Sequence, residues 1–157
     1  MIIVSACLLG LNTKYDGKAN AHALLQKYCA MGKFIPVCPE QLGGLPTPRV
    51  PVEIIGGTGR DVLKGQCTVQ GEQGEVVTSE FILGAKEVIK ILEIFTVTAA
   101  ILKERSPSCG TNSIYDGSFS HRIKSGQGVT AALLMEHNIP VYSEEELTED
   151  KFLELLI

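Results

Sequence analysis

Short continuous apolar runs alternate along the chain with longer segments whose apolar residues recur at helical spacing. Runs of the first kind are typical of buried strands. Because a helix between two strands returns the chain to the same end of a sheet, this alternation favours parallel pairing. We predict an α/β sandwich with a mostly parallel sheet of about four strands, in which Pro36 lies in an edge strand or begins its strand. The expected strands are 1–6, 34–37, 98–102 and 139–142, and the expected helices are 21–31, 78–95, 129–137 and 143–157.

Residue types that favour helix starts precede three of these helices. Asn20 is the expected N-cap of the first helix, and Thr78 or Ser79 is the expected N-cap of the second. Ser143 and Glu146 have the spacing of a capping box before the last helical region. Each cap is expected to accept a hydrogen bond from an amide in the first turn.

Two segments rich in glycine and proline interrupt the pattern, at 39–74 and 106–128. We predict the first to be a long ordered loop followed by a small hairpin, in which 66–69 pairs with 75–77. Its apolar residues argue for order, and long ordered loops in compact domains are usually functional. Neither segment marks a domain boundary, so we expect a single domain over residues 1–157.

The composition is that of a globular protein with a core of its own. Of the 157 residues, 45% are hydrophobic and 20% are charged, which excludes intrinsic disorder. The formal net charge of −4 disfavours a strongly basic nucleic-acid-binding module. No apolar run approaches the roughly 18 residues that a membrane-spanning helix needs, so we expect no membrane span.

The chain has five cysteines, an odd number. Secreted disulfide frameworks usually hold an even set in a shorter chain, so we expect reduced thiols and a cytoplasmic protein. The residues Val4–Cys7 look like a lipoprotein cleavage box. A signal peptide needs a basic region and an apolar region of roughly 7–15 residues before such a box, and neither is present, so lipidation is not expected.

Three cysteines, Cys7, Cys38 and Cys109, each follow a predicted strand. Because the carboxyl ends of parallel strands meet at one edge of a sheet, these thiols are expected to converge there. Soft thiolate ligands suit zinc, Cu(I) or an iron–sulfur cluster, and three of them leave an open position typical of catalytic metals. The alternative is that the thiols are scattered. Cys29 in a helix and Cys67 in the hairpin are expected to be structural.

Other candidate groups carry weaker signals. His22, His121 and His137 are expected to be surface or hydrogen-bonded histidines, and no Cys-x-x-Cys motif indicates thioredoxin-type redox chemistry. The tripeptide Tyr-Asp-Gly occurs twice, at 15–17 and 115–117. Since Asp-Gly favours turns, we expect two similar turns, with a shared placement beside one site as the alternative.

Specific sequence blocks surround the three cysteines in a fixed order. They are Ser-Ala-Cys-Leu-Leu-Gly at 5–10, Pro-Val-Cys-Pro-Glu at 36–40, Gly-Gly-Leu-Pro-Thr-Pro-Arg at 43–49, Lys-Glu-Arg-Ser-Pro-Ser-Cys-Gly at 103–110, and Gly-Gln-Gly-Val-Thr-Ala-Ala-Leu-Leu at 126–134. Together with the two Tyr-Asp-Gly motifs, these blocks resemble the thiouracil desulfidases (TudS-like proteins), small bacterial proteins long classed as a domain of unknown function. The resemblance covers nearly the whole chain.

This resemblance implies a Rossmann-like fold and an oxygen-sensitive [4Fe–4S] enzyme. In the family three cysteines hold the cluster, and the matching positions here are Cys7, Cys38 and Cys109. The fourth iron has no protein ligand and takes the sulfur of a thiolated pyrimidine. The implied reaction is a non-redox desulfuration by a hydrolase or lyase, in which thiouracil and water give uracil and sulfide.

Several side chains near the cysteines are candidates for roles in such a reaction. Glu40, two residues after Cys38, is the candidate base for the attacking water, and its alternative role is to cap a loop or pair with Arg49. Ser106 and Ser108 are candidates to hydrogen-bond substrate, water or cluster sulfur, or they form a turn. The candidate substrate-binding residues are Lys14, Asp16, Arg49 and Arg105.

The sequence departs from the family pattern in three ways. Thr13 and Lys14 stand where many relatives have a further cysteine, which suits an open iron. His121 stands where small residues are common. A second domain associated with thiolated tRNA in longer relatives is absent, so a free base or nucleoside is the expected substrate. Two alternatives remain open, a hydrolase with a Cys₃ zinc site and a non-enzymatic protein that binds a small ligand.

Overall fold

A computed structural model describes all residues from Met1 to Ile157. Its centre is a four-stranded sheet of β1 (Ile2–Ser5), β2 (Phe34–Val37), β5 (Ala99–Leu102) and β8 (Val141–Ser143). The strands lie in the order β2-β1-β5-β8, and every neighbouring pair is parallel. The predicted α/β fold with a parallel sheet is therefore confirmed, and β2, which contains Pro36, is an edge strand.

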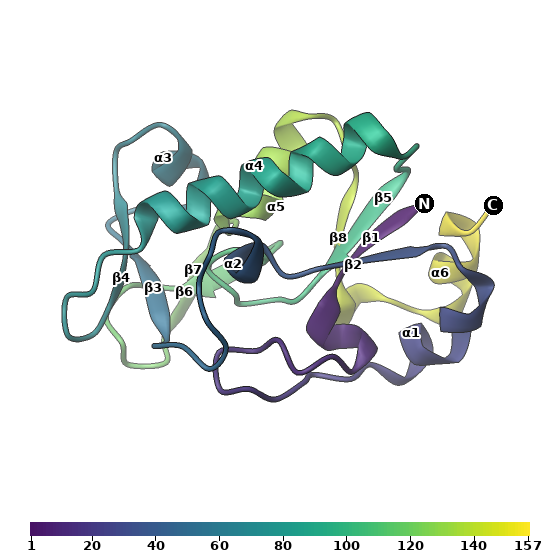
Figure 1. Cartoon of the computed structure of the whole chain (residues 1–157), viewed down its shortest axis with the longest axis horizontal. Coiled ribbons are helices and arrows are strands. Elements are labelled where there is room, and N and C mark those ends of the chain that lie inside the picture. Colours follow the sequence, from purple (N-terminus) through teal and green to yellow (C-terminus); the bar gives the residue numbers. More distant parts are fainter.

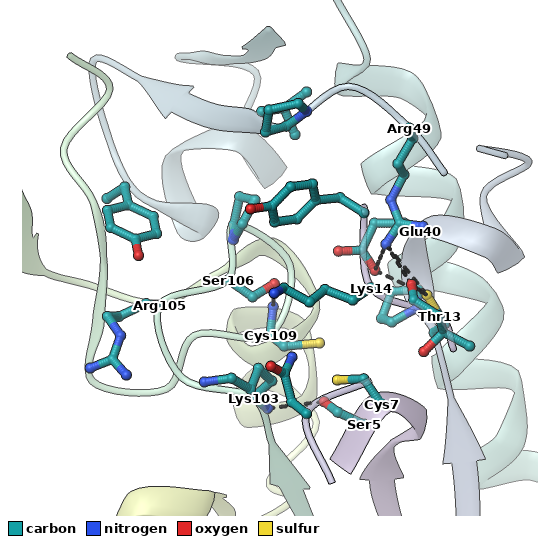
Figure 2. Close-up of a pocket in the computed structure, with 18 of the residues that line it drawn as sticks. Ser5, Cys7, Thr13, Lys14, Glu40, Arg49, Lys103, Arg105, Ser106 and Cys109 are labelled. Atoms are coloured by element: carbon teal, nitrogen blue, oxygen red, sulfur yellow. Dashed lines mark hydrogen bonds and ion pairs between the residues drawn. The ribbon is translucent and has the colours of Figure 1, made fainter. Parts of the chain in front are cut away.

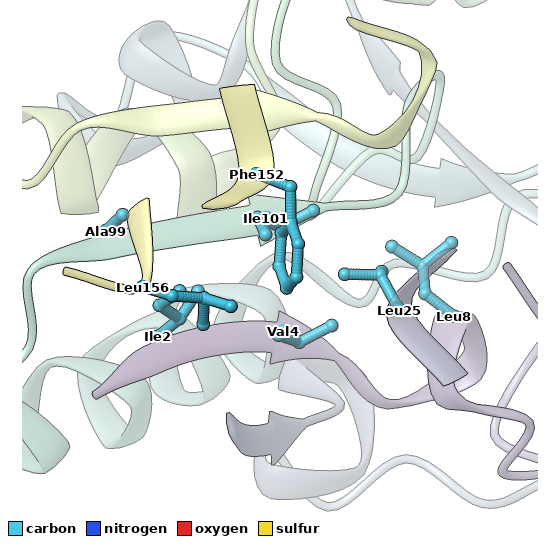
Figure 3. Packing of buried hydrophobic residues seen from close by; sticks show 8 residues of the cluster. All are labelled: Ile2, Val4, Leu8, Leu25, Ala99, Ile101, Phe152 and Leu156. Atoms are coloured by element: carbon cyan, nitrogen blue, oxygen red, sulfur yellow. The ribbon is translucent and has the colours of Figure 1, made fainter. Parts of the chain in front are cut away.

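Helices cover both faces of this sheet, which makes three layers (Figure 1). On one face, α1 (Ala23–Tyr28) and α6 (Glu149–Leu155) pack against Ile2 and Val4. Figure 3 shows the Phe152 ring of α6 above the strands, close to side chains of β1 and β5. On the other face, α4 (Thr78–Ile94) and α5 (Val129–Glu136) pack against Ile3 and its neighbours. None of the helices has the combination of length and apolarity that a membrane crossing requires.

A second group of elements, called here the hairpin region, lies beyond the sheet. It consists of the antiparallel pair β3 (Val52–Ile55) and β4 (Thr68–Gly71), the antiparallel pair β6 (Ser113–Tyr115) and β7 (Ile123–Ser125), and α3 (Gly59–Leu63). The long helix α4 runs from this region across the sheet (Figure 1). Phe81 near the start of α4 is buried in a core cluster with Ile54 and Val69 of the hairpin. This shared core joins the two halves of the molecule.

The predicted hairpin is present in part, with a shifted register. The amides of Gly71 and Val77 donate to the carbonyls of Glu75 and Val69 at 2.8 and 3.0 Å, so 75–77 runs antiparallel to 69–71. The main partner of Thr68–Gly71 is Val52–Ile55, which we had expected to belong to the long loop. The long loop also contains two short helices, α3 and α2 (Pro39–Leu42). The segment 106–128, expected to be irregular, contains β6 and β7.

The helix boundaries agree with the prediction better than the caps do. The first helix is shorter than expected, with a 3₁₀ turn at Cys29–Met31, and its N-cap is His22 in place of Asn20. Thr78 is the first residue of α4, and its hydroxyl accepts a bond from the amide of Val69. Ser143 does cap a 3₁₀ turn, Glu144–Glu146, while Thr148 caps α6.

Candidate active site

A cavity of about 390 Å³ opens at the carboxyl ends of the parallel strands. One side is lined by residues at or just after the ends of β1, β2 and β5, among them Ser5, Val37 and Lys103. The other side is lined by the hairpin region, including Val52 and Tyr115. The cavity therefore lies between the two halves of the molecule, at the edge where parallel α/β sheets bind their ligands.

The three cysteines that follow strands all line this cavity. Cys7 lies in the 3₁₀ turn η1 (Ala6–Leu9) directly after β1, and Cys38 lies between β2 and α2. Cys109 lies in the turn that follows β5, and Figure 2 shows the sulfurs of Cys7 and Cys109 on the same side of the cavity. The structure thus brings together the thiols that the strand order predicted to converge. Cys29 is exposed on the far end of α1, and half-buried Cys67 donates to the carbonyl of Thr58, so neither belongs to the site.

Hydrogen-bonding groups surround the sulfur atoms. Arg49 Nη2 donates to Cys38 Sγ at 3.8 Å, and the Cys38 thiol lies 3.6 Å from the carbonyl oxygen of Thr13. Ser108 Oγ lies 3.4 Å from Cys109 Sγ, and its single proton is shared between this sulfur and a carboxylate. Donors directed at sulfur, one of them cationic, stabilise the thiolate form that metal binding requires.

Burial raises the pKa of all three thiols above the ordinary value. For Cys7 the hydrogen bond from Asn20 partly opposes the effect of burial. For Cys38, burial and the negative charge of Glu40 raise the pKa to about 11. Burial and the charge of Glu40 also raise the pKa of Cys109. The thiols are therefore protonated in the metal-free protein, and they lose their protons when they bind a metal.

The arrangement of the thiols fits a cluster better than a single ion. Nowhere in the chain do three His, Cys, Asp or Glu side chains come close enough together to bind one metal ion. In a [4Fe–4S] cube each thiolate binds a different iron, so the cluster's ligands stand further apart than the ligands of one zinc. Three soft sulfur donors from separate strand ends line one cavity, and soft thiolates suit such a cluster.

A carboxylate and two hydroxyls form a hydrogen-bonded chain beside the cysteines. Ser108 Oγ donates to Glu40 Oε1 at 2.7 Å, and Ser106 Oγ lies 3.1 Å from Ser108 Oγ. Glu40 and Ser106 line the cavity. Ser108 is only 1% exposed and lies behind the wall, so it contacts Glu40 and not a ligand. Arg49 Nη2 is 3.9 Å from Glu40 Oε2, which confirms the pairing considered for Glu40.

Two glycines allow the short helix α2 to carry Glu40 into this position. A Cβ atom on Gly43 would stand 2.0 Å from the carbonyl oxygen of Glu80, and one on Gly84 would stand 1.9 Å from that of Pro39. The backbones of α2 and α4 are therefore in direct contact. No other residue type fits at either position without moving α2, because real Cβ atoms do not approach backbone so closely.

Every cation that lines the cavity already has an acidic partner. Lys14, Arg49 and Arg105 do lie at the cavity, as expected, whereas Asp16 does not line it and instead binds Lys14. Lys103, which sequence reasoning missed, also lies at the cavity, within one of the family blocks. The four pairs are Lys14–Asp16 at 3.2 Å, Arg49–Glu40 at 3.9 Å, Lys103–Glu144 at 2.5 Å and Arg105–Glu145.

Glu104 is a buried acidic residue at the cavity that the sequence analysis also missed. Its Oε1 accepts bonds from the amides of Thr111, Asn112 and Ser113, each at 3.0 Å. Burial alone raises the pKa of Glu104, but these bonds and one from Ser143 outweigh burial and leave the pKa below its ordinary value. A buried carboxylate thus holds the chain that follows Cys109.

The three histidines fulfil the expectation of surface or bonded side chains only in part. His121 is exposed and lines the rim of the cavity, and Nδ1 of His137 lies 2.9 Å from the carbonyl of Leu133. Nδ1 of His22 is buried without a partner. Neither His22 nor His137 lines the cavity.

The fold and the cavity define an α/β protein with thiols and a carboxylate gathered at the strand ends of a parallel sheet. The sequence matches the 2-thiouracil desulfurase family over residues 2–146, and the chain belongs to this family. It is 45% identical over 149 residues to YbbK of Bacillus subtilis (strain 168), a protein described as uncharacterized, with 95% of this chain and 99% of YbbK covered. Its structure is similar to that of the [4Fe–4S]-dependent thiouracil desulfidase TudS, with a TM-score of 0.85 and 40% identity, covering 99% of this chain and 98% of that one.

Proposed function

We propose that this protein is a [4Fe–4S]-dependent desulfidase that hydrolyses the carbon–sulfur bond of a thiolated pyrimidine. In the reaction, thiouracil and water give uracil and hydrogen sulfide, with no net oxidation or reduction. The observation that carries the proposal is the cavity at the strand ends, where three thiols and the pair of Glu40 and Ser108 lie together. Family membership supports the same activity.

Cys7, Cys38 and Cys109 are the proposed ligands of the cluster. When bound, the cluster supplies a Lewis-acidic iron for the sulfur of the substrate. The protein's part is to hold three thiolates in place and to direct Arg49 at the sulfur of Cys38 and Asn20 at that of Cys7. These donors offset the repulsion between negative charges that burial would otherwise make costly.

Glu40 is the proposed general base. Its Oε2 does not accept from Ser108 but accepts from the Cys38 thiol at 3.5 Å, and this bond is lost once Cys38 gives up its proton to bind the cluster. Oε2 can then take a proton from the attacking water. Ser108 fixes the carboxylate from behind the cavity wall, and Ser106 presents a hydroxyl to the cavity itself. A base positioned in this way contributes a factor of roughly 10²–10⁴ to a hydrolysis rate.

The proposed substrate is a small thiolated pyrimidine, as a free base or nucleoside. The cavity volume of about 390 Å³ falls within the range of small-molecule sites. A phosphate on the substrate would compete with the carboxylates that already pair Lys14, Arg49 and Arg105. The net charge of −4 also gives no support to tRNA as the main substrate.

We also propose that residues 1–157 form one desulfidase domain that works in the cytoplasm. The last helix, α6, lies beyond the family match, but its Phe152 is fully buried against Ile2 and Val4 of the sheet. All five cysteines are free thiols, which suits a reducing compartment.

Anaerobic purification with an iron and sulfide count tests the proposal directly. About four iron and four inorganic sulfide per chain, with sulfide release from 2- or 4-thiouracil, is the expected result. Comparison of the base, its nucleoside and its 5′-monophosphate then identifies the preferred form. A protein that holds no iron after reconstitution and releases no sulfide would contradict the proposal.

A further inference from the structure

The two Tyr-Asp-Gly motifs fold into the same turn. In the first, Oδ1 of Asp16 accepts from the amide of Lys18 at 3.0 Å. In the second, Oδ1 of Asp116 accepts from the amide of Ser118 at 2.9 Å. Each aspartate also faces a cation, since Lys14 lies 3.2 Å from Asp16 and an arginine lies 3.5 Å from Asp116. The repeat in the sequence is therefore a repeat in local structure.

The glycine that ends each motif has a backbone conformation that suits this turn. Gly17 has φ of +75° and Gly117 has φ of +90°, in the left-handed region that glycine adopts without strain. The tyrosine that begins each motif lines the cavity of the active site. Two equivalent turns, about 100 residues apart in the sequence, thus present Tyr15 and Tyr115 to one space.

Hydrogen bonds from backbone amides fix both turns to the walls of the cavity. The carbonyl of Tyr15 accepts from the amide of Arg49 at 2.8 Å, which ties the first turn to the segment that follows α2. Oε1 of Glu53 in β3 accepts from the amides of Gly117 and Phe119, at 3.0 and 3.3 Å. The positions of the two tyrosines are therefore set by anchored backbone.

The side chains of these tyrosines also have defined neighbours. Lys14 Nζ lies 5.3 Å from the centre of the Tyr15 ring, and His121 meets the Tyr115 ring edge to face at 6.3 Å. By contrast, Tyr28 packs on Phe152 in the core beside the sheet. The chain has four tyrosines, and the fourth, at position 142, also packs in that core, so only the two in Tyr-Asp-Gly motifs face the cavity.

We propose that Tyr15 and Tyr115 are substrate-binding residues that hold the pyrimidine ring of the substrate by aromatic contact. This inference rests on the proposed function, because it concerns the ring of the same substrate. Aromatic side chains bind a pyrimidine through its π face, and they do so without reading individual hydrogen-bonding groups. Asp16 and Asp116 are positioning residues that hold the two turns, and they make no contact with substrate.

Alanine and phenylalanine variants of the two tyrosines test this proposal. We expect Tyr15→Ala and Tyr115→Ala each to raise KM for thiouracil about 10-fold with little change in kcat, because stacking is lost. Tyr15→Phe and Tyr115→Phe keep the ring and are expected to stay within about 2-fold of the unaltered protein. Tyr28→Ala, outside the cavity, is the matched control and is expected to leave KM unchanged. Iron content and thermal midpoint show whether each variant is folded and loaded.

A binding measurement gives a second readout that needs no turnover. The chain contains no tryptophan, so Tyr115→Trp introduces a single tryptophan at the cavity. We expect uracil to quench its fluorescence in the cluster-loaded protein, with saturation. A tryptophan introduced at position 28 (Tyr28→Trp) is expected to show no quenching by uracil.

The outcomes separate this inference from the proposed function. An unchanged KM in both alanine variants overturns the inference, and so does a loss in the phenylalanine variants as large as in the alanine variants. If the unaltered, loaded protein releases no sulfide from any thiopyrimidine, the proposed function fails. The Tyr115→Trp titration then decides the inference alone: saturable quenching by uracil supports it, and its absence overturns it.

Discussion

The parallel sheet and the hairpin region contribute different kinds of groups to the same cavity. The ends of β1, β2 and β5 bring thiols, acids and cations, of which Cys7, Cys38 and Glu40 are examples. The hairpin region brings mainly apolar and aromatic side chains, such as Val52, Tyr115 and Phe119 at its edge. The sheet half therefore carries the reacting groups, and the hairpin half shapes the space that a substrate enters.

The two halves also differ in where they are exposed. All residues of the central strands β1 and β5 are buried, whereas Ile123–Ser125 of β7 is partly or fully exposed. The hairpin region still has a buried core of its own, which includes Ile54 and Val69. Elements with few buried apolar contacts open at a lower free energy than core strands, so we expect β7 to open before β1 and β5.

Loss of a proposed cluster ligand tests whether the sheet half carries the reacting groups, and it is expected to have the strongest effect. We expect Cys7→Ser, Cys38→Ser or Cys109→Ser to lower iron from about four per chain to near zero and to abolish sulfide release, because hard serine oxygen is a poor ligand for iron in such clusters. Iron analysis and the visible spectrum of anaerobic protein measure this. Cys29→Ser and Cys67→Ser are the matched controls, and iron loss in these would show that the ligands had been wrongly assigned.

A smaller but still large effect is expected from Glu40→Gln. The amide has no basic oxygen for the proton of water, so kcat should fall by a factor of roughly 10²–10⁴ while iron content stays unchanged. Steady-state sulfide release and iron analysis separate the two quantities. Glu80→Gln, on the neighbouring helix and outside the cavity, is the control; full activity in Glu40→Gln would rule out this carboxylate as the base.

Ser108→Ala tests whether the buried Ser108 hydroxyl contributes to the reaction by positioning the Glu40 carboxylate. The variant removes the 2.7 Å bond to the carboxylate, and we expect kcat to fall about 10-fold with KM unchanged, the range for a hydrogen bond to a charged group. Ser79→Ala is a matched control, because Ser79 makes a similar bond to Glu80 on the surface of α4. A rise in KM with constant kcat would instead mean that Ser108 contacts substrate.

The last prediction concerns stability and the junction between the two halves. Because the pKa of Glu104 is lowered in the folded protein, its contribution to stability is fully present above its ordinary pKa of 4.5 and is lost as the pH falls through the lowered value. Glu104→Gln should lower the free energy of unfolding at neutral pH by about 1–3 kcal/mol. The loss should shrink below about pH 4. Urea titrations at several pH values measure both; equal losses at pH 7 and pH 3 would contradict this account.

The centre of the sheet was predictable because β1 and β5 are buried on both faces. Residues such as Ile2–Val4 and 99–102 form continuous apolar runs, and the helices between them leave little choice but parallel pairing. The convergence of Cys7, Cys38 and Cys109 follows from that pairing, since each comes after a strand. For the sheet, the apolar pattern of each strand and the arrangement of the strands in the fold lead to the same structure.

The hairpin region was not predictable in the same way. Pro51 and Gly56 bracket the four residues of β3, so the segment looks like a loop, and its partner Thr68–Gly71 lies beyond an intervening helix. The predicted N-cap of α4 was wrong for a related reason. The Thr78 hydroxyl accepts a hydrogen bond from the amide of Val69 in β4, and no local sequence pattern indicates this contact. Pairing that depends on distant residues leaves no periodic signal.

Sequence reasoning identified several residues that the structure places at the cavity, but it did not identify which side chains face the cavity and which are buried behind its wall. Glu40, Ser106 and Arg49 lie at the cavity as expected, but Ser108 stands behind its wall and Asp16 turns to Lys14. Charge type and spacing indicate which side chains can take part in a reaction. Whether a side chain faces a ligand or supports another group depends on packing that only the folded chain determines.

The contact between α2 and α4 has a consequence for how this protein can change over generations. With Gly43 and Gly84 in place, the backbone of α2 rests directly on a helix whose core contacts lie in both halves of the molecule. One added methyl group at either position would push α2 outward and carry Glu40 away from the thiols. A change of Gly84 to alanine replaces one hydrogen by a methyl group on α4, a helix with no reacting group, and would thus silence the site while the sheet and its three cysteines remained intact.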